Sequence, residues 1–455
     1  MPFIPHTADE TRAMLAMLGV DSIDALFEEI PRELINTELG AIPAGLTEME
    51  VMRLMRERAS RDEGAVCFLG AGCYDHHIPA AVWDLVGRGE FMTAYTPYQA
   101  EASQGTLQVI YEYQTMMAEL TAMDVSNASV YDGGSGLAEA VLMAIRANRK
   151  TGSRKVLCAG SLHPLYRRAA DAIVRNQQIE LAELPFDATG TVPASALDRY
   201  RDGEVAALVI QQPSFFGSLE AVDELTDRAH ERGMFVIAVV NPLSLGLLKP
   251  PGQWGEAGAD VVCGDGQPLG IPMASGGPSF GFLCCRQEIV RQLPGRLIGR
   301  TVDVEGNEGF VLTLQAREQH IRRAKATSNI CTNQGLLVTA ATVHMSLLGY
   351  VGLSRVASHC HAQTVKLVEA LTAIEGVTQR FAGPYFHEVV IDLPCTASSV
   401  MADLAVHGII GGLDLGGYFD ALTHSLLVCA TEKRTDGEID HFADAMRRVL
   451  EERRT

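Results

Sequence analysis

The sequence has few basic residues. Lysine and arginine number 37 against 56 aspartates and glutamates, so the formal net charge is -19 at pH 7. A surface of this charge repels phosphate backbones, and no basic tail or stripe offsets it. We therefore expect no nucleic-acid partner.

Cysteine is also scarce, with 10 residues in 455, and no C-x-x-C pair occurs. This spacing favours neither a zinc knuckle nor a disulfide framework. Two histidine clusters, Asp75-His76-His77 and His359-Cys360-His361, lack the i, i+4 spacing of a helical metal site. The sequence therefore predicts no metal site.

Long apolar runs are scarce as well. The sequence suggests no segment with the ~18 apolar residues of a membrane span, and residues 1–10 lack a basic flank followed by an apolar run. We expect a soluble, cytoplasmic protein with no membrane partner.

The hydrophobic content of 47% and the 43 glycines are typical of a well-buried globular protein with many tight turns. A single core stops growing near ~250–300 residues, so a chain of this length favours two lobes. Changes in pattern divide it into a helical arm with an active-site segment (1–100), a large α/β domain (101–352) and a small α+β lobe (353–455).

The arm shows two helix starts. Thr7 with Glu10, and Thr47 with Glu50, have the S/T-x-x-E spacing of a capping box. Between them an amphipathic stretch at 14–30 ends before Pro31.

The large domain alternates short β-branched runs with helical ones. The expected strands are 128–131, 155–159, 205–210, 235–240, 261–263 and 280–284. This alternation implies crossover helices on both faces of a mostly parallel sheet. The small lobe is expected to follow a different order, with helices at 354–374, 397–407 and 436–452 and strands at 388–393 and 425–430.

The strongest local signal is the run 131–136 (YDGGSG), which follows an expected strand and opens a helix. Backbone amides of Gly133, Gly134 and Ser135, aided by the helix dipole, suit a phosphate. A tight turn without ligand explains the same residues equally well. For His163, just past a strand end, stacking on a ring and ordinary packing both stay open.

Three further segments carry polar or charged groups. Residues 263–278 form a glycine-rich loop at the carboxyl edge of the sheet, without a dinucleotide or P-loop fingerprint. Residues 95–101 (YTPYQAE) group two phenols, an amide and a carboxylate, which suit a small amino acid, although packing is commoner for such tyrosines. Residues 294–300 and 317–329 concentrate positive charge, which suits an anionic cofactor or an acidic partner as well as a solvated helix face.

Taken in order, these segments resemble the amino-terminal half of the glycine cleavage system P protein, in the form that bacteria split into two subunits. The runs that carry the resemblance are 72–79 (GCYDHHIP), 95–99 (YTPYQ), 104–108 (QGTLQ), 312–323 (LTLQAREQHIRR), 325–333 (KATSNICTN), 411–415 (GGLDL) and 431–432 (TE). They extend from the first hundred residues into the last lobe.

The resemblance implies a fold-type-I, aminotransferase-like architecture. It also implies a decarboxylase that acts on glycine with pyridoxal phosphate and passes the aminomethyl group to the lipoyl arm of the H protein. In such enzymes a lysine holds the cofactor as a Schiff base, and the pyridinium ring is the electron sink.

This chain lacks a lysine at the required place. Its lysines are Lys150, Lys155, Lys249, Lys325, Lys366 and Lys433. Aligned on the cofactor-bearing half, Gln267, five residues before Pro272, stands at the lysine position, and glutamine forms no Schiff base. The aspartate that would pair with the pyridine nitrogen is also missing, because the corresponding strand end has Asn241.

The resemblance therefore implies a subunit that completes the site of a lysine-bearing partner in an α2β2 assembly, with the cofactor bound covalently by that partner. The glycine turn and His163 would be vestigial. The candidate site residues, as groups that reach into the partner's site, are Tyr95, Tyr98, Gln99 and Glu101, followed by Arg317, Arg322 and Asn329. Two alternatives stay open: a purely structural scaffold subunit, and an autonomous pyridoxal-phosphate lyase that uses Lys249.

Overall fold

The computed structural model describes residues 5–35, 40, 42–61, 64–92 and 94–453. Backbone contacts divide the chain into two units, residues 1–63 and residues 64–455. The domain limits expected near residues 100 and 352 stay predictions.

The first unit consists of short helices. They are α1 (Ala8–Leu18), α2 (Arg32–Ile35) and α3 (Glu48–Ala59), with a 3-10 turn at Asp24–Phe27. Both predicted capping boxes are confirmed, at Thr7 and at Thr47. The amphipathic stretch at 14–30 is not one helix, because α1 ends at Gly19, whose φ of 73° is left-handed.

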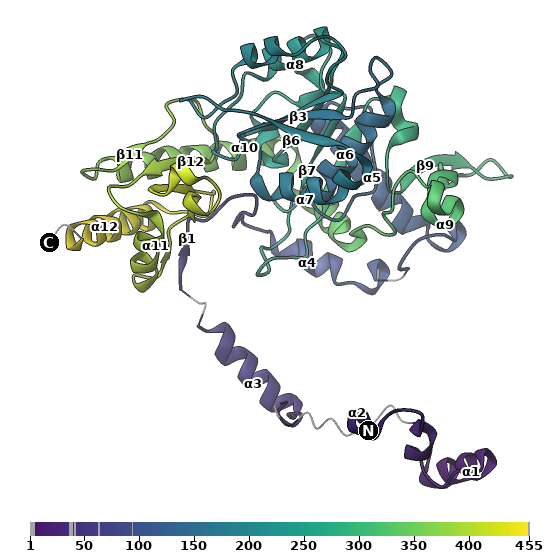
Figure 1. The fold of residues 1–455 in the computed structure, drawn as a ribbon. Coiled ribbons are helices and arrows are strands. Elements are labelled where there is room, and N and C mark those ends of the chain that lie inside the picture. The colour runs from purple at the N-terminus through teal and green to yellow at the C-terminus, as the bar shows by residue number, and fades with distance from the viewer. Residues whose placement is uncertain (1–4, 36–39, 41, 62–63, 93, 454–455) are drawn as a thin grey trace. The chain divides into compact units, whose positions relative to one another are not determined.

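A seven-stranded sheet forms the centre of the second unit (Figure 1). Its strand order is β2 (Val125–Ser126), β8 (Gly281–Cys285), β7 (Val261–Asp265), β6 (Phe235–Val240), β5 (Ala207–Gln212), β3 (Lys155–Ala159) and β4 (Glu180–Leu184). The strands from β7 to β4 are parallel, whereas β8 and β2 pair antiparallel at one edge. The predicted mostly parallel sheet is confirmed.

Alternate residues of the strands point to opposite faces of this sheet. Val209 and Val239 pack with α6 (Gly133–Ala147) and α7 (Pro164–Val174). Leu208 and Ala238 pack on the other face, against α5 (Gln104–Thr121), α8 (Val222–Glu231) and α10 (Gly335–Thr372). Helices therefore cover both faces, as the apolar runs predicted.

The small lobe has a four-stranded antiparallel sheet. Its order is β11 (Thr378–Gln379), β12 (Glu388–Asp392), β15 (Ser425–Cys429) and β14 (Leu413–Asp414), and its helices are α11 (Ala397–Val406) and α12 (Asp436–Glu452). The predicted α+β lobe is confirmed. One strand comes from far away in the sequence, because β1 (Val66–Cys67) pairs in parallel with β13 (Ile409–Ile410).

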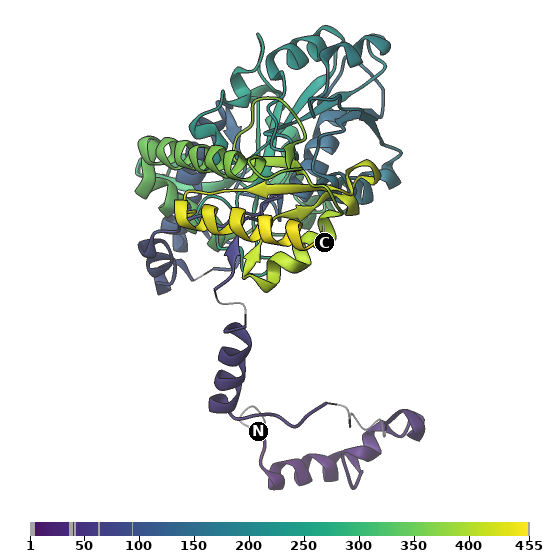
Figure 2. The same ribbon diagram turned by 90° about the vertical axis from the view of Figure 1, so that its left-hand side faces the viewer.

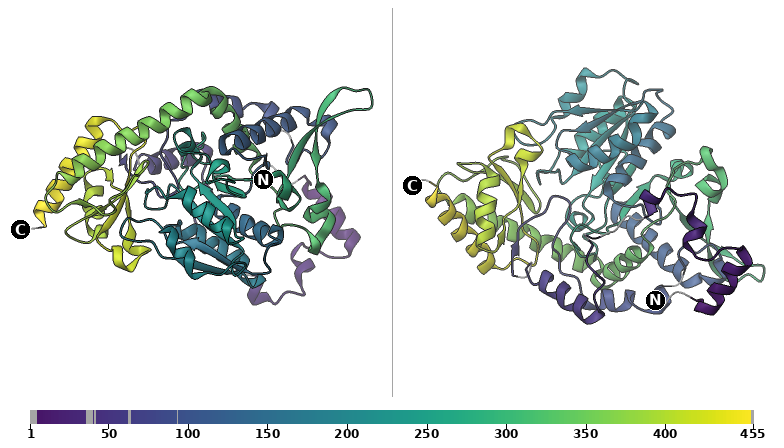
Figure 3. Two further views of the ribbon diagram at one scale, coloured as in Figure 1. Left: turned by 90° about the horizontal axis from the view of Figure 1, so that it is seen from above. Right: turned by 60° about the horizontal axis from the view of Figure 1, so that its bottom comes forward.

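Helix α10 connects the two parts of the second unit. It contacts α5 and α4 (Ala80–Val86) beside the central sheet and α12 in the small lobe, and Figures 2 and 3 show it passing from one to the other. Gly349, with φ 58° and ψ -175°, breaks the helical conformation within it.

The expectation that no segment is apolar enough to cross a membrane is wrong on composition. Helix α10 is long and apolar enough by that measure, with a window of hydropathy 1.6. Half of that window is nevertheless buried inside the protein, as for the core helix of a globular domain.

A β-hairpin lies beside the large domain. Its strands β9 (Leu297–Val302) and β10 (Glu308–Thr313) pair antiparallel and are followed by the short helix α9 (Gln319–Arg322).

Candidate active-site region

A pocket of about 590 Å³ lies where the parallel strands end. The carboxyl ends of such strands are where α/β proteins bind ligands, because the loops there diverge. Its walls come from the start of α6, the start of α7 and the loop after β7. The lining residues include Gly72, Cys73, Tyr131, Asp132, Gly134, His163, Tyr166, Asp265, Gln267 and Ser279.

The predicted glycine turn is confirmed as the start of α6. Asp132 caps the helix, since its Oδ1 accepts a hydrogen bond from the Ser135 amide at 2.7 Å. The Gly133 amide donates to Oδ2 of Asp265 at 3.1 Å. Burial raises the pKa of Asp265, and three hydrogen bonds to its carboxylate act against that rise. The sequence left open whether this turn binds a phosphate or no ligand. In the structure a carboxylate of the chain itself accepts the Gly133 hydrogen bond.

His163 is buried at the start of α7. Its ring stacks on Tyr166, with centroids 4.4 Å apart and planes 10° apart, and its Nε2 lies 2.9 Å from the carbonyl oxygen of Ala71. Burial lowers the pKa of His163. Of the two readings left open for this histidine, the geometry favours packing within the chain.

Gln267 is almost fully buried, with 3% of its surface exposed. Its Oε1 accepts from the Tyr74 amide at 2.9 Å, and its Nε2 donates to the Tyr74 and Ile271 carbonyls at 2.9 and 2.8 Å. The side chain therefore satisfies all its amide groups within the protein. It holds the loop after β7 against the 71–77 segment.

The residues of this pocket do not fit a covalently held pyridoxal cofactor. No lysine is among the described residues that line it. Asn241, at the end of β6, caps the Leu243 amide through Oδ1 at 3.0 Å, and its neutral amide cannot supply the charge of an aspartate. Lys249 pairs with Asp223 at 2.8 Å, and both side chains are about half exposed. This position argues against Lys249 as the cofactor-bearing lysine.

The segment 95–101 lies on the surface. Tyr95 is 82% exposed and Tyr98 is 49% exposed, and Gln99 and Glu101 are exposed as well. The Tyr98 ring meets His320 edge-on at 5.3 Å, and the guanidinium carbon of Arg296 lies 5.8 Å from its centroid.

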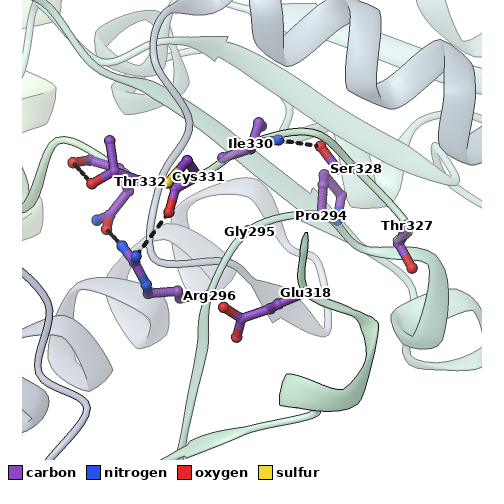
Figure 4. Close-up of a pocket in the computed structure, with 10 residues that line it drawn as sticks. Pro294, Gly295, Arg296, Glu318, Thr327, Ser328, Ile330, Cys331 and Thr332 are labelled. Atoms are coloured by element: carbon purple, nitrogen blue, oxygen red, sulfur yellow. Dashed lines mark hydrogen bonds between the residues drawn. The ribbon is translucent and has the colours of Figure 1, made fainter. Parts of the chain in front are cut away.

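Arg296 is a residue that sequence reasoning missed. It is only 5% exposed, and its guanidinium donates to Asn333 Oδ1 at 2.7 Å and to the Cys331 carbonyl at 2.9 Å. Figure 4 shows it pointing toward the 331–333 segment, with Glu318 nearby. The excess positive charge at 294–300 was noted, but the sequence did not separate this inward arginine from its solvated neighbours.

The remaining predicted residues are not brought together. Arg322 is exposed, and its Nε donates to the Ala316 carbonyl at 2.9 Å. Asn329 is exposed too. The side chain of Arg317 lies outside the described residues. The surface around Arg296 and the α6 pocket are joined, because the Cys331 amide donates to the Tyr131 hydroxyl at 3.1 Å.

The structure brings together one member of each histidine cluster. His76 Nδ1 and Cys360 Sγ lie 2.8 and 3.2 Å from Oε2 of Glu432, and the three atoms lie within 4.8 Å of one another. Burial acts to raise the pKa of Glu432, but the hydrogen bond and charge of His76, with hydrogen bonds from the His77 amide and Cys360, outweigh it and lower that pKa to about 2. Three distant segments converge here, so no local spacing signals the cluster. That no metal is bound stays a prediction.

The parallel sheet, the glycine turn at α6 and the pocket beyond the strand ends define the class: the chain has the fold of the fold-type-I pyridoxal-phosphate enzymes. More narrowly, it belongs to the glycine cleavage system P-protein family, whose sequence model matches residues 1–446.

Relatives of known name cover the whole chain. It is 61% identical to a probable glycine dehydrogenase (decarboxylating) subunit 1 of Alcanivorax borkumensis, over 99% of this chain and 100% of that one. The protein of the same name from Nitrosomonas europaea is 58% identical, over 99% of each.

Solved structures agree with this family. A crystal structure of glycine decarboxylase (P-protein) in inhibitor-bound form matches with a TM-score of 0.88 and 42% identity, over 99% of this chain and 100% of that one. A glutamate decarboxylase from Lactobacillus brevis, with a TM-score of 0.68 and 12% identity, shares the fold over 94% of this chain and 96% of its own.

Proposed function

We propose that this chain is subunit 1 of a two-subunit glycine dehydrogenase (decarboxylating), and that it completes the active site of a partner subunit that carries the lysine-bound pyridoxal phosphate. The observation that carries the proposal is the buried side chain of Gln267, which uses its whole amide within the protein; the family resemblance puts this residue at the lysine position. The relatives named subunit 1 support the division into two chains.

The assembly would be an α2β2 heterotetramer that decarboxylates glycine and transfers the aminomethyl group to the lipoyl arm of the H protein. When bound in the partner, the cofactor supplies the electron sink for the loss of carbon dioxide. This chain's part is to bind and orient groups at the edge of that site.

The exposed phenols are the groups best placed for this part. Tyr95 extends from the surface with 82% of its area exposed, so a partner surface can cover it. Tyr98 is held from two sides, by His320 and by the buried Arg296, which fixes its ring for contact with a ligand. Gln99 and Glu101 follow on the same exposed segment, whereas Arg317, Arg322 and Asn329 are the weaker candidates.

Reconstitution with the lysine-bearing partner tests the proposal. We expect this chain alone to show no cofactor absorbance with pyridoxal phosphate, and glycine-dependent exchange of carbon dioxide to appear only after mixing. In the mixed enzyme, Tyr95→Phe should lower kcat/KM about tenfold to a hundredfold, which is the usual effect of losing a hydrogen bond to a charged ligand.

Tyr350→Phe is the matched control, because Tyr350 is an equally exposed tyrosine, at 80%, on α10. It should leave turnover unchanged. Unchanged turnover in both variants would favour the scaffold alternative. A borohydride-trapped cofactor on this chain alone would overturn the proposal and direct attention to Lys249.

A further inference from the structure

The start of α6 has the features of an anion-binding site. Amide groups and the helix dipole meet there, and α6 is long enough to give that dipole its full effect. A phosphate group is one anion that suits such a site. Groups of the chain itself already use some of these donors.

A carboxylate of the same chain uses one of them. Oδ2 of Asp265 accepts from the Gly133 amide at 3.1 Å, and Oδ1 accepts from the Gln267 amide at 2.9 Å and from the Ser279 hydroxyl. Both oxygens are thereby satisfied by donors, which suits the ionised, acceptor-only form of the carboxyl group. Burial and the nearby Asp132 carboxylate raise the pKa of Asp265, and the three donors act against that rise.

A second carboxylate caps the helix, and a phenol lies against its first residue. Asp132 Oδ1 accepts from the Ser135 amide at 2.7 Å, and the Ser135 hydroxyl accepts from the Asp132 amide at 3.0 Å. A Cβ added at Gly133 would lie 2.7 Å from the Tyr166 hydroxyl. The space next to the helix start is therefore lined by negative charge and covered by a ring.

We infer that Asp265 is a built-in anion that closes the phosphate end of this pocket, so that the chain rejects phosphorylated ligands, pyridoxal phosphate included, through charge and occupancy as well as through its missing lysine. The inference deepens the proposed function and rests on it for its biological meaning. It predicts that restoring the lysine alone does not restore a cofactor site.

The test compares three full-length variants: Gln267→Lys, Gln267→Lys with Asp265→Ser, and Gln267→Lys with Asp260→Ser. Asp260 is the matched control, because it lies at the opposite end of β7 and accepts from the Val236 amide at 2.7 Å. Each protein is incubated with pyridoxal phosphate or with unphosphorylated pyridoxal, reduced with borohydride, and digested. Peptide mass spectrometry then measures the label at residue 267.

We expect the Asp265→Ser double variant to prefer pyridoxal phosphate over pyridoxal by about tenfold or more, as charge-assisted hydrogen bonds to phosphate provide. The single variant and the Asp260 control should show no such preference. Preference for the phosphorylated probe in the single variant, or its absence in the Asp265→Ser variant, would overturn the inference.

A second measurement needs no new lysine. Inorganic phosphate, compared with chloride at equal ionic strength, should raise the melting temperature of Asp265→Ser more than that of the unmodified chain; Asp265→Asn replaces it if the serine variant does not fold. Equal stabilisation of both proteins would contradict a closed site. A label on a native lysine of the unmodified chain would refute the proposed function instead, and it maps to a different peptide from residue 267.

Discussion

Glu388 is a buried carboxyl group on β12 that connects the small lobe to the 71–74 segment. Its two oxygens accept hydrogen bonds from the Ala71 amide at 2.6 Å and from the Tyr74 hydroxyl at 2.8 Å. Burial raises the pKa of Glu388 from its usual 4.5 to about 7, although both hydrogen bonds act to lower it.

This shift predicts a pH dependence of stability. Because the folded-state pKa is the higher one, the folded chain binds more protons than the unfolded chain between about pH 4.5 and 7, and stability falls as pH rises through that window. We expect Glu388→Gln, which keeps an acceptor for Ala71, to match the unmodified chain near pH 5. At pH 8.5 it should be more stable by on the order of 3 kcal/mol, at about 1.4 kcal/mol per pKa unit.

Thermal unfolding at both pH values measures this difference. Glu119→Gln, which changes an exposed carboxylate on α5, should give a curve parallel to that of the unmodified chain. A parallel curve for Glu388→Gln as well would show that Glu388 is ionised in the folded protein at both pH values.

At the scale of residues, the sequence predicts positions better than partners. The resemblance to the lysine-bearing half is enough to find Gln267, and the glycine run at 133–136 is enough to find the start of α6. The carboxylate that accepts from the Gly133 amide, at the start of α6, comes from Asp265 at the end of β7. Such pairs depend on which strands become neighbours, so one sequence does not reveal them.

Among the elements, the break in α10 has a testable basis. Gly349 has φ 58°, and a Cβ there would contact nothing within 4 Å. Gly349→Ala should therefore destabilise the chain through its backbone alone, by about 1–2 kcal/mol. Gly437→Ala, also with open space for a Cβ but in the first turn of the regular helix α12, should stabilise it by up to about 1 kcal/mol.

Melting temperatures of the two variants check this pair. Stabilisation by both would mean that the helix at Gly349 is continuous in solution. In that case the direction of the small lobe, which α10 connects to the large domain, would not be set by this glycine.

The apolar pattern of the sequence predicts those strands that are buried on both faces of the sheet. Strands β3, β6 and β7 have almost uninterrupted buried runs and were predicted. The expected strand at 128–131 is wrong: Ser129 has φ 133°, and only Val130 forms a bridge, to Gly281. Strand β4 was missed because it lies at the sheet edge, where polar side chains interrupt the pattern.

For the whole molecule, the apolar helix α10 bears on whether the protein associates with a membrane. Half of its most apolar window is buried by the protein itself, so that surface is not available to lipid. We expect the chain, expressed with its partner, to stay in the supernatant after high-speed centrifugation of a detergent-free lysate, and any small amount in the pellet to be released by alkaline washing. Recovery in a carbonate-resistant pellet would contradict this.

The pairing of β1 with β13 bears on how the chain is made. Val66 lies beside Ile409, and the carbonyl of Phe68 accepts a hydrogen bond from the Cys429 amide. During synthesis the 66–68 segment leaves the ribosome long before either partner exists. The large domain can form first, but the small lobe cannot form until residues 409–429 have been synthesised, and the backbone partner of Phe68 is absent until then. A nascent chain interrupted late in translation would consequently expose this segment to chaperones and proteases.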